Sequence, residues 1–293
     1  MAFALVSCAA SPPPPADPGL TAVVTPDPPE PAPSRGAEST PEPEPRSQAA
    51  LPARGWLGVE LSATEPTQAG VLIRAVVPGS PAAGAGVLPG DVLLRVDGKP
   101  MNAPEDVIQA VGSQVAGSRV SLALKRGQQD RMLAAELVAR PDDDEVQRMT
   151  YVGAPAPAFE SLAPAQGAVK PTLQALRGKV VVVEFWSPWC VVCRLLVPTM
   201  NEWHGRYSAQ GAEVIGITTE SVVGAAQAAR QLGISHPVLS DETGKTTLAY
   251  RAMALPTVFV IDRAGTVRDV MVGYYSERIQ EIEALIERLV AEP

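Results

Sequence analysis

The run from Val180 to Trp186 constrains the fold of this chain more than any other feature. It holds only β-branched and aromatic residues apart from one acid, Glu184. Such a run is typical of a strand buried on both faces in a parallel sheet, and a helix should follow it. Cys190 and Cys193 lie where that helix should begin. The sequence therefore predicts a dithiol or disulfide centre at the end of a buried strand.

The two cysteines are expected to have different roles. If Cys190 opens the helix, its sulfur lies at the positive end of the helix macrodipole, which favours thiolate over thiol. Cys193 lies one turn further along, within reach of a mixed disulfide formed on Cys190. Cys190 is therefore the predicted nucleophile and Cys193 the predicted resolving thiol.

Two other interpretations of a C-x-x-C pair are half of a zinc site and a pair of core thiols. The chain has three cysteines and two histidines, His204 and His236, and no second C-x-x-C. These residues do not assemble convincingly into a four-ligand zinc site. We therefore favour a redox-active disulfide, with no metal and no other cofactor.

Around this pair the chain resembles the thioredoxin superfamily, and within it the extracytoplasmic TlpA/ResA-type thiol-disulfide oxidoreductases. The matching motifs are Glu184-Phe185-Trp186, Trp189-Cys190-x-x-Cys193, Pro198 and Leu255-Pro256-Thr257. The resemblance extends over about residues 154–290 and implies an α/β thioredoxin-like fold with protein thiol or disulfide substrates. In the family the proline of the last motif is cis and faces the cysteines, which the resemblance implies for Pro256. Trp189 belongs to the same predicted site.

Residues 191–192 and Glu184 are two further features of the predicted site. The family usually has proline before the second cysteine, whereas this chain has Val191-Val192 between the sulfurs, a position that tunes the reduction potential in the family. Glu184 occupies the place of a buried acid that helps to deprotonate the resolving cysteine. It is alternatively a buried acid with only a structural hydrogen bond.

Composition limits the classes of partner. The 293-residue chain has a net charge of −8, and its lysines and arginines are not clustered, so we expect no nucleic-acid partner. No apolar run approaches the roughly 20 residues that a membrane-spanning helix requires. Two globular domains fit within this length.

The N-terminal segment 1–8 ends in Leu5-Val6-Ser7-Cys8, which resembles the lipobox of bacterial lipoproteins. The resemblance implies a lipid anchor on Cys8 and a place on the periplasmic side of the bacterial cell envelope. Because the segment is shorter than a working signal and has no basic residue, we expect the true start codon to lie upstream. The alternative is an accidental thiol at Cys8.

Residues 9–53 are dominated by proline. The part from residue 11 onward holds 14 of the 30 prolines of the chain. Such a composition cannot bury a core, so we predict a disordered tether. A ligand for proline-binding modules is the less favoured alternative.

A third region, residues 54–140, contains short β-like runs between glycine turns and resembles a PDZ domain of the HtrA-protease type. The matching pieces are Gly55–Val59, Gly79–Ala83, Gly86–Leu93 and Val96–Pro100. PDZ domains add an extended peptide to a sheet edge and hold its terminal carboxylate with loop N–H groups. The resemblance assigns peptide binding to four residues, Trp56, Leu57, Gly58 and Val59. Alternatively, this domain only packs on its neighbours.

An acidic linker is predicted at 141–153, followed by the redox domain at 154–293. Together these features predict a membrane-anchored extracytoplasmic thiol-disulfide oxidoreductase whose PDZ domain recruits a protein partner or substrate. Family members usually act as reductants, for example in cytochrome c maturation. The alternative is a PDZ adaptor with a non-catalytic thioredoxin-like domain.

Overall fold

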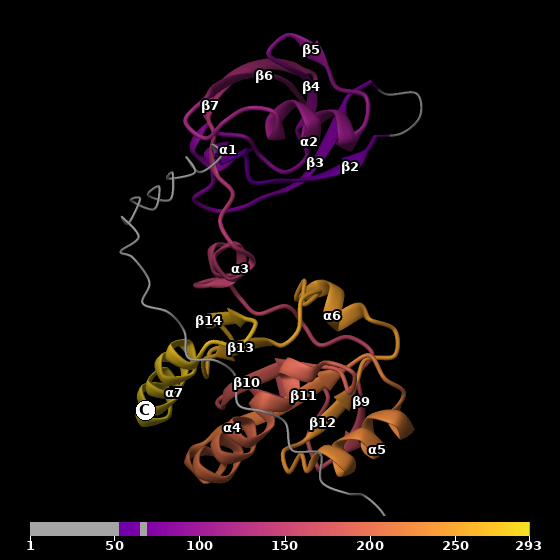
Figure 1. The fold of residues 1–293 in the computed structure, drawn as a ribbon, viewed down its shortest axis with the longest axis vertical. Helices are drawn as coiled ribbons and strands as arrows, with labels where there is room; N and C mark the ends of the chain where they lie inside the picture. Colours follow the sequence, from indigo (N-terminus) through magenta and orange to yellow (C-terminus); the bar gives the residue numbers. More distant parts are fainter. Residues whose placement is uncertain (1–52, 65–68, 293) are drawn as a thin grey trace, which may run out of the picture. The chain divides into compact units, whose positions relative to one another are not determined.

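The computed structural model describes residues 53–64 and 69–292, and Figure 1 shows its elements along the chain. The lipobox-like segment with Cys8 lies outside the described residues, as does nearly all of the proline-rich segment. Within the described ranges, no helix is both long and apolar enough to cross a lipid bilayer. The described residues form an N-terminal β domain, from β1 to β8, and a C-terminal α/β domain, from α3 to α7.

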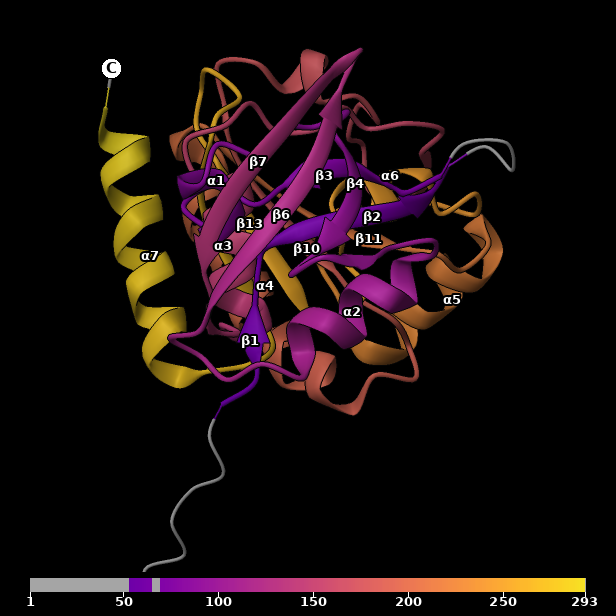
Figure 2. The ribbon, with the colours of Figure 1, turned by 90° about the horizontal axis from the view of Figure 1, so that it is seen from above.

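The β domain is built on an antiparallel sheet of six strands, in the order β2-β3-β4-β6-β7 with β5 paired to β4. Its elements are β1 (Gly55–Trp56), β2 (Val59–Ala63), β3 (Val71–Val76), α1 (Pro81–Gly84), β4 (Val92–Val96), β5 (Lys99–Pro100), α2 (Pro104–Gly112), β6 (Arg119–Arg126), β7 (Gln129–Glu136) and β8 (Val138–Ala139). Val120, Leu122 and Leu124 alternate along β6 and are buried, as expected for a strand with one face on a core. Figure 2 shows β6 and β7 as a long antiparallel ribbon.

The α/β domain contains a mixed sheet of six strands in the order β14-β13-β10-β11-β12-β9. Its elements are α3 (Asp143–Tyr151), β9 (Ala163–Gln166), η1 (Leu173–Leu176), β10 (Val180–Phe185), α4 (Val191–Tyr207), η2 (Ser208–Gln210), β11 (Ala212–Thr218), α5 (Val222–Leu232), β12 (Val238–Ser240), α6 (Lys245–Ala249), β13 (Thr257–Ile261), β14 (Val267–Val272) and α7 (Ser276–Ala291). Every residue of β10 is buried. This strand runs parallel to β11 and antiparallel to β13, so the valine run forms a fully buried strand in a mixed sheet.

Helices cover both faces of this mixed sheet. On one face, α4 and α7 pack with even-numbered residues of β10, Val180 and Val182. On the other face, odd-numbered residues such as Val183 pack with side chains of α3, η1 and the residues after α6. Figure 1 shows α3 and α4 on opposite sides of β10. Because side chains alternate along a strand, Glu184 lies on the face that α4 covers.

Residues 141–153, where the sequence predicts an acidic linker, contain helix α3. Asp142 is its N-cap and accepts the backbone N–H of Glu145 at 2.8 Å. Asp143 and Asp144 lie in the first turn with Glu145, where negative charge is stabilised by the helix macrodipole. The helix packs against β14, which ends one side of the mixed sheet. The acidic residues therefore begin a helix of the α/β domain.

Candidate functional site

Cys190 and Cys193 form a disulfide at the N-terminus of α4. Cys190 is the N-cap of this helix, and its Sγ accepts the backbone N–H of Cys193 at 3.1 Å. An acceptor in this position lies at the positive end of the helix macrodipole and faces a helix N–H. The local structure therefore favours negative charge on the Cys190 sulfur when the bond is reduced.

The two cysteines are buried, but the residues beside them in the chain are exposed. Cys190 is 8% and Cys193 is 2% exposed, and both pack in an apolar cluster with Trp186 and with alanines of α5. We call the exposed apolar side chains that neighbour them in sequence the apolar rim: Trp189, Val191, Val192 and Leu195. Trp189 is the most exposed of them, at 72%. A substrate that reaches the disulfide therefore meets apolar surface.

Glu184 is buried in an apolar interior near the end of β10. Its side chain is 1% exposed, and its Oε1 has no hydrogen-bond partner among the described residues. Burial raises the pKa of this carboxyl to about 8, because the charged form loses its hydration. Near neutral pH the protonated form of Glu184 therefore predominates, and a minor fraction is ionised.

Pro256 directly precedes β13 and follows Leu255 through a cis peptide bond. Leu255 packs against the apolar cluster that contains both cysteines, so this segment of chain reaches the disulfide. Thr257, the next residue, pairs with Phe185 at the end of β10. The Pro256 carbonyl accepts the N–H of Gly273 at 2.7 Å. The structure thus brings Cys190, Cys193 and the Leu255–Pro256 segment together.

His236 is a feature that the sequence reading missed. It lies in the loop between α5 and β12 and is fully buried. Its Nδ1 contacts Asn201 Oδ1 at 3.2 Å, which requires a proton on Nδ1, and burial lowers its pKa to about 4. The Nε2 of His236 and the indole Nε1 of Trp186 are buried with no partner among the described residues. Both polar atoms lie next to Gly216. A Cβ added at Gly216 would lie 3.2 Å from His236 Nε2 and 2.8 Å from Trp186 Nε1.

The sequence contains a signal for the close packing around Gly216. Gly216 interrupts the apolar run of β11, and a glycine inside a buried strand often marks the close approach of another group. Gly216 pairs with Glu184 in the parallel ladder between β10 and β11. The buried acid therefore lies beside a position where two further buried polar groups meet.

The remaining predictions concern metal binding and Cys8. Across the ranges that the structure describes, no group of three or more histidine, cysteine or acidic side chains is placed to hold a metal ion. His204 lies on α4, where its Nδ1 contacts the hydroxyl of Ser208 at 3.1 Å. Cys8 lies outside the described residues, so its predicted lipid anchor remains an expectation.

The β domain has a groove beside the residues predicted to bind a peptide. A cavity of about 790 Å³ is lined by Trp56, Leu57, Gly58 and Val59 on one side and by residues of α2 on the other. The carbonyls of Leu57 and Gly58 accept N–H groups from Ala82 and Val77, both at 2.9 Å. Within the described part of the chain, β2 pairs only with β3, so it is the edge of the sheet that borders this groove and to which a peptide strand can add.

Gly58 is required by the geometry of this groove. Its φ is +80°, and an added Cβ would lie 2.2 Å from the Cβ of Ser80. Ser80 is buried, caps α1 and donates its hydroxyl to the Gly58 carbonyl at 3.3 Å. A larger residue at position 58 would displace the loop that ends β1.

Comparison with protein families gives two matches, one in each domain. The AhpC/TSA family model matches residues 152–270, and the PDZ domain model matches residues 55–137. Thiol-disulfide oxidoreductase ResA of Geobacillus kaustophilus is 32% identical over 118 residues, which cover 40% of this chain and 67% of that protein. Protein DipZ of Mycobacterium tuberculosis is 38% identical over 107 residues, but the matched part is only 15% of its length.

Solved structures also match each domain. The thiol:disulfide interchange protein DsbE of Chlorobium tepidum is 31% identical, with a TM-score of 0.44, over 47% of this chain and 97% of that chain. The HtrA-type protease AlgW with a decapeptide is 33% identical, with a TM-score of 0.30, over 31% of this chain and 30% of that chain. The family matches confirm the predicted fold class, a thioredoxin-like α/β domain preceded by a mainly β PDZ domain.

Proposed function

Because this chain belongs to the family of thiol-disulfide oxidoreductases that includes ResA, we propose that it exchanges a dithiol for a disulfide at Cys190 and Cys193. The observation that carries this proposal is the position of Cys190 as N-cap of α4, with the Cys193 N–H donated to its sulfur. A sulfur held in this way is a good nucleophile and a good leaving group.

In the reducing direction, the Cys190 thiolate attacks one sulfur of a substrate disulfide. The other substrate sulfur leaves as a thiolate and takes a proton from solvent. Cys193 then loses its proton and attacks the Cys190 sulfur, which closes the Cys190–Cys193 disulfide and releases the second substrate thiolate. The substrate gains two electrons and the protein loses two. A dithiol donor must reduce the protein again before the next cycle.

Glu184 is the group to which we assign the proton that Cys193 loses. It lies on the face of β10 that α4 covers, and β10 leads directly to the cysteines. The pKa of this carboxyl, about 8, is close to neutral pH, so the same group can both accept and release a proton there. Its burial also keeps competing water away from the proton transfer.

The substrates proposed are proteins that carry disulfides. The apolar rim, with Trp189 at 72% exposure, favours a substrate with apolar residues beside its disulfide. The groove of the PDZ domain would recruit a partner or substrate by adding its terminal residues to β2. We further propose that the protein is a reductant on the periplasmic side of the bacterial envelope, for example in cytochrome c maturation.

Insulin reduction tests the activity directly. Purified protein with dithiothreitol as electron donor should reduce insulin faster than dithiothreitol alone, and Cys190→Ser should abolish the gain. Cys193→Ser should accumulate a mixed disulfide with the substrate, visible on a non-reducing gel. Equal rates for the wild type and Cys190→Ser would reject the proposal.

A second candidate function is a PDZ adaptor whose thioredoxin-like domain only docks. The observation that favours it is the open groove of about 790 Å³. An adaptor would bind peptides through Trp56–Val59 while showing no difference between the wild type and Cys190→Ser in the insulin assay. Peptide binding together with insulin reduction would instead support recruitment by an enzyme.

Two further measurements test the direction of electron flow and the lipid anchor on Cys8. Titration against glutathione should give a reduction potential well below the roughly −120 mV of a strong oxidant such as DsbA. Expressed in a bacterial host with an upstream start, the protein should incorporate labelled palmitate, and Cys8→Ala should lose the label. An oxidising potential would contradict the proposed direction of electron flow. Absence of label from the wild type would contradict the lipid anchor.

A further inference from the structure

Helix α3 holds the segment that leads from α6 to β13. The side-chain amide of Gln147 donates to the carbonyl of Arg251 at 2.7 Å, and the hydroxyl of Tyr151 donates to the carbonyl of Ala249 at 2.7 Å. The ring of Tyr151 is buried and stacks on Tyr250 with 6.5 Å between ring centroids. Two side chains of α3 therefore fix the backbone at the end of α6 and just after it.

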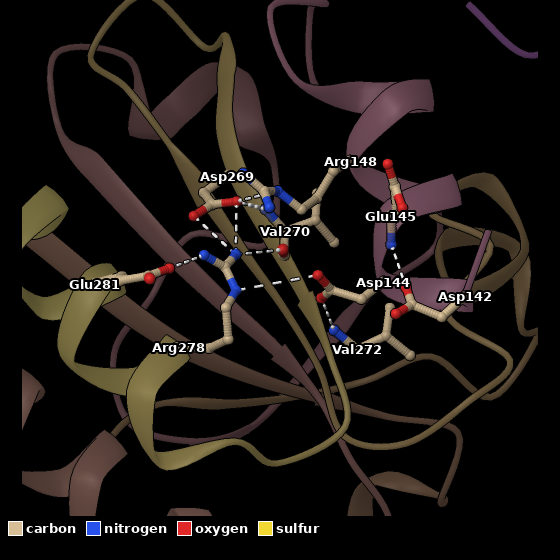
Figure 3. A network of polar contacts seen from close by, with 9 residues as sticks. All are labelled: Asp142, Asp144, Glu145, Arg148, Asp269, Val270, Val272, Arg278 and Glu281. Carbon is tan, nitrogen blue, oxygen red and sulfur yellow. Dashed lines mark hydrogen bonds and ion pairs between the residues drawn. The ribbon is translucent and has the colours of Figure 1, made fainter. Parts of the chain in front are cut away.

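The first turn of α3 is attached to β14 instead. Asp144 Oδ1 accepts the backbone N–H of Val272 at 2.8 Å. Figure 3 shows Asp269 of β14 between two arginines, Arg278 from α7 and Arg148 from α3. Arg278 Nη2 donates to both Asp269 oxygens at 2.9 and 3.0 Å, and Arg148 Nε lies 3.2 Å from Oδ1. This network fixes α3 on the strand that ends the sheet.

The segment 251–257 lies between these two attachments. At its start, Arg251 has a left-handed φ of 50°, a conformation that persists only when the surroundings hold it. At its end, Thr257 pairs with Val272, the residue that Asp144 binds. Between them, Leu255 packs against the cluster that contains the disulfide. Helix α3 thus binds the start of this segment directly and its end through Val272, the strand partner of Thr257.

We propose that Asp144 and Gln147 of α3 are positioning residues of the redox site, which hold segment 251–257 in the place where it meets a protein substrate. The segment is available to a substrate because Met253 is 73% exposed and Ala254 is also exposed. Neither positioning residue lies on α4, the helix that carries the cysteines. The proposal rests on the proposed thiol-disulfide exchange.

Displacement of segment 251–257 has a kinetic signature. A substrate that binds across a displaced segment loses contacts in both its bound state and its transition state, so KM rises while kcat stays nearly constant. The loss of one neutral hydrogen bond corresponds to about a fivefold change. The attack of a small reagent on Cys190 does not use the segment, so its rate should stay the same.

The test uses the full chain with Gln147→Met, which keeps the side-chain length but removes the N–H donor, and Asp144→Ala. Glu145→Ala is the matched control, because Glu145 is exposed on the same helix. We expect KM for insulin to rise about fivefold in the two test variants, with kcat and the rate of Cys190 alkylation by iodoacetamide within about twofold of wild type. The control should match the wild type.

Hydrogen exchange of the oxidised protein supplies a readout that needs no activity. The N–H groups of Ala252 and Met253, bound to Thr247 and Arg251 at 3.0 and 2.9 Å, should exchange about fivefold faster in Gln147→Met. Unchanged KM together with unchanged exchange in folded variants would overturn the positioning role. If the wild type itself fails the insulin test, the proposed function is rejected, and exchange alone decides whether α3 holds the segment.

Discussion

Glu184 is a carboxyl group in an apolar interior, and at the residue scale its ionisation links stability to pH. Its pKa is about 8 in the folded protein against an ordinary value of 4.5. Below pH 4.5 it is protonated in both states. Between pH 4.5 and 8 the unfolded chain loses the proton and the folded protein keeps it, so the free energy of unfolding falls as pH rises. Above pH 8 the free energy of unfolding stays lower by the full cost of burying the charge, about 5 kcal/mol.

Glu184→Gln removes this dependence. We expect wild type and variant to differ little in the free energy of unfolding near pH 5, and the variant to be more stable by about 3 kcal/mol or more near pH 9. Urea unfolding of the oxidised proteins across this range measures the difference. Glu202→Gln, which alters an exposed acid of α4, should show no such trend. A constant difference between Glu184→Gln and wild type would show that the acid is ionised throughout.

Gly216 offers a second residue-scale prediction. A Cβ there would approach Trp186 Nε1 to 2.8 Å and His236 Nε2 to 3.2 Å, and both side chains are fixed by burial. We expect Gly216→Ala to lower the free energy of unfolding by about 1 to 3 kcal/mol. Gly205→Ala, in α4 with nothing within 4 Å of the new methyl group, should instead raise it by about 0.5 to 1 kcal/mol. Equal effects would contradict the crowding at Gly216.

At the scale of single elements, the attachment of α3 depends on Arg278. Its side chain and that of Asp269 are only 16% and 11% exposed, so the loss of the arginine leaves a mostly buried carboxylate. We expect Arg278→Ala to destabilise the protein by roughly 2 to 3 kcal/mol, because Arg148 and the Val270 N–H still compensate part of the charge. Thermal unfolding measures this.

Arg268→Ala is the matched control for that experiment. Arg268 lies on β14, the strand that holds Asp269, and forms a single ion pair with Asp262 at 3.4 Å. Its side chain is 40% exposed. Its removal should lower the free energy of unfolding by less than about 1 kcal/mol. A similar loss in both variants would mean that the Figure 3 network contributes no more than a surface ion pair.

Elements formed by local apolar patterns could be predicted from the sequence, whereas those held by distant contacts could not. The run Val180–Trp186, which the sequence predicts as a buried strand, contains β10, because a buried strand needs only its own apolar residues between turns. Helix α3 was not predicted, because its acidic residues resemble a linker and its hydrogen-bond partners outside the helix lie 98 to 128 residues later. The burial of His236 depends likewise on Asn201 and Gly216, which no periodic pattern connects to it.

On the scale of the whole molecule, each domain has a core of its own, and α3 belongs to the second. Tyr151 lies in the same buried cluster as Phe259 and Tyr250, whereas the β-domain cluster contains no residue of α3. We expect a fragment of residues 142–293 to fold and to reduce insulin as the full chain does. A fragment that begins at residue 152, where the family match begins, should be less stable by about 3 kcal/mol or more. Equal unfolding midpoints would place α3 outside the folded unit.

The separation between α3 and its partners also has a consequence for the newly made chain. Asp144 leaves the ribosome 128 residues before Val272, which at about 5 to 20 residues per second is a delay of roughly 6 to 26 s. During this delay the PDZ domain is complete and can fold, while α3 has no strand to bind. The helix that begins the redox domain is therefore among the last parts of that domain to be secured, after translation has passed Arg278.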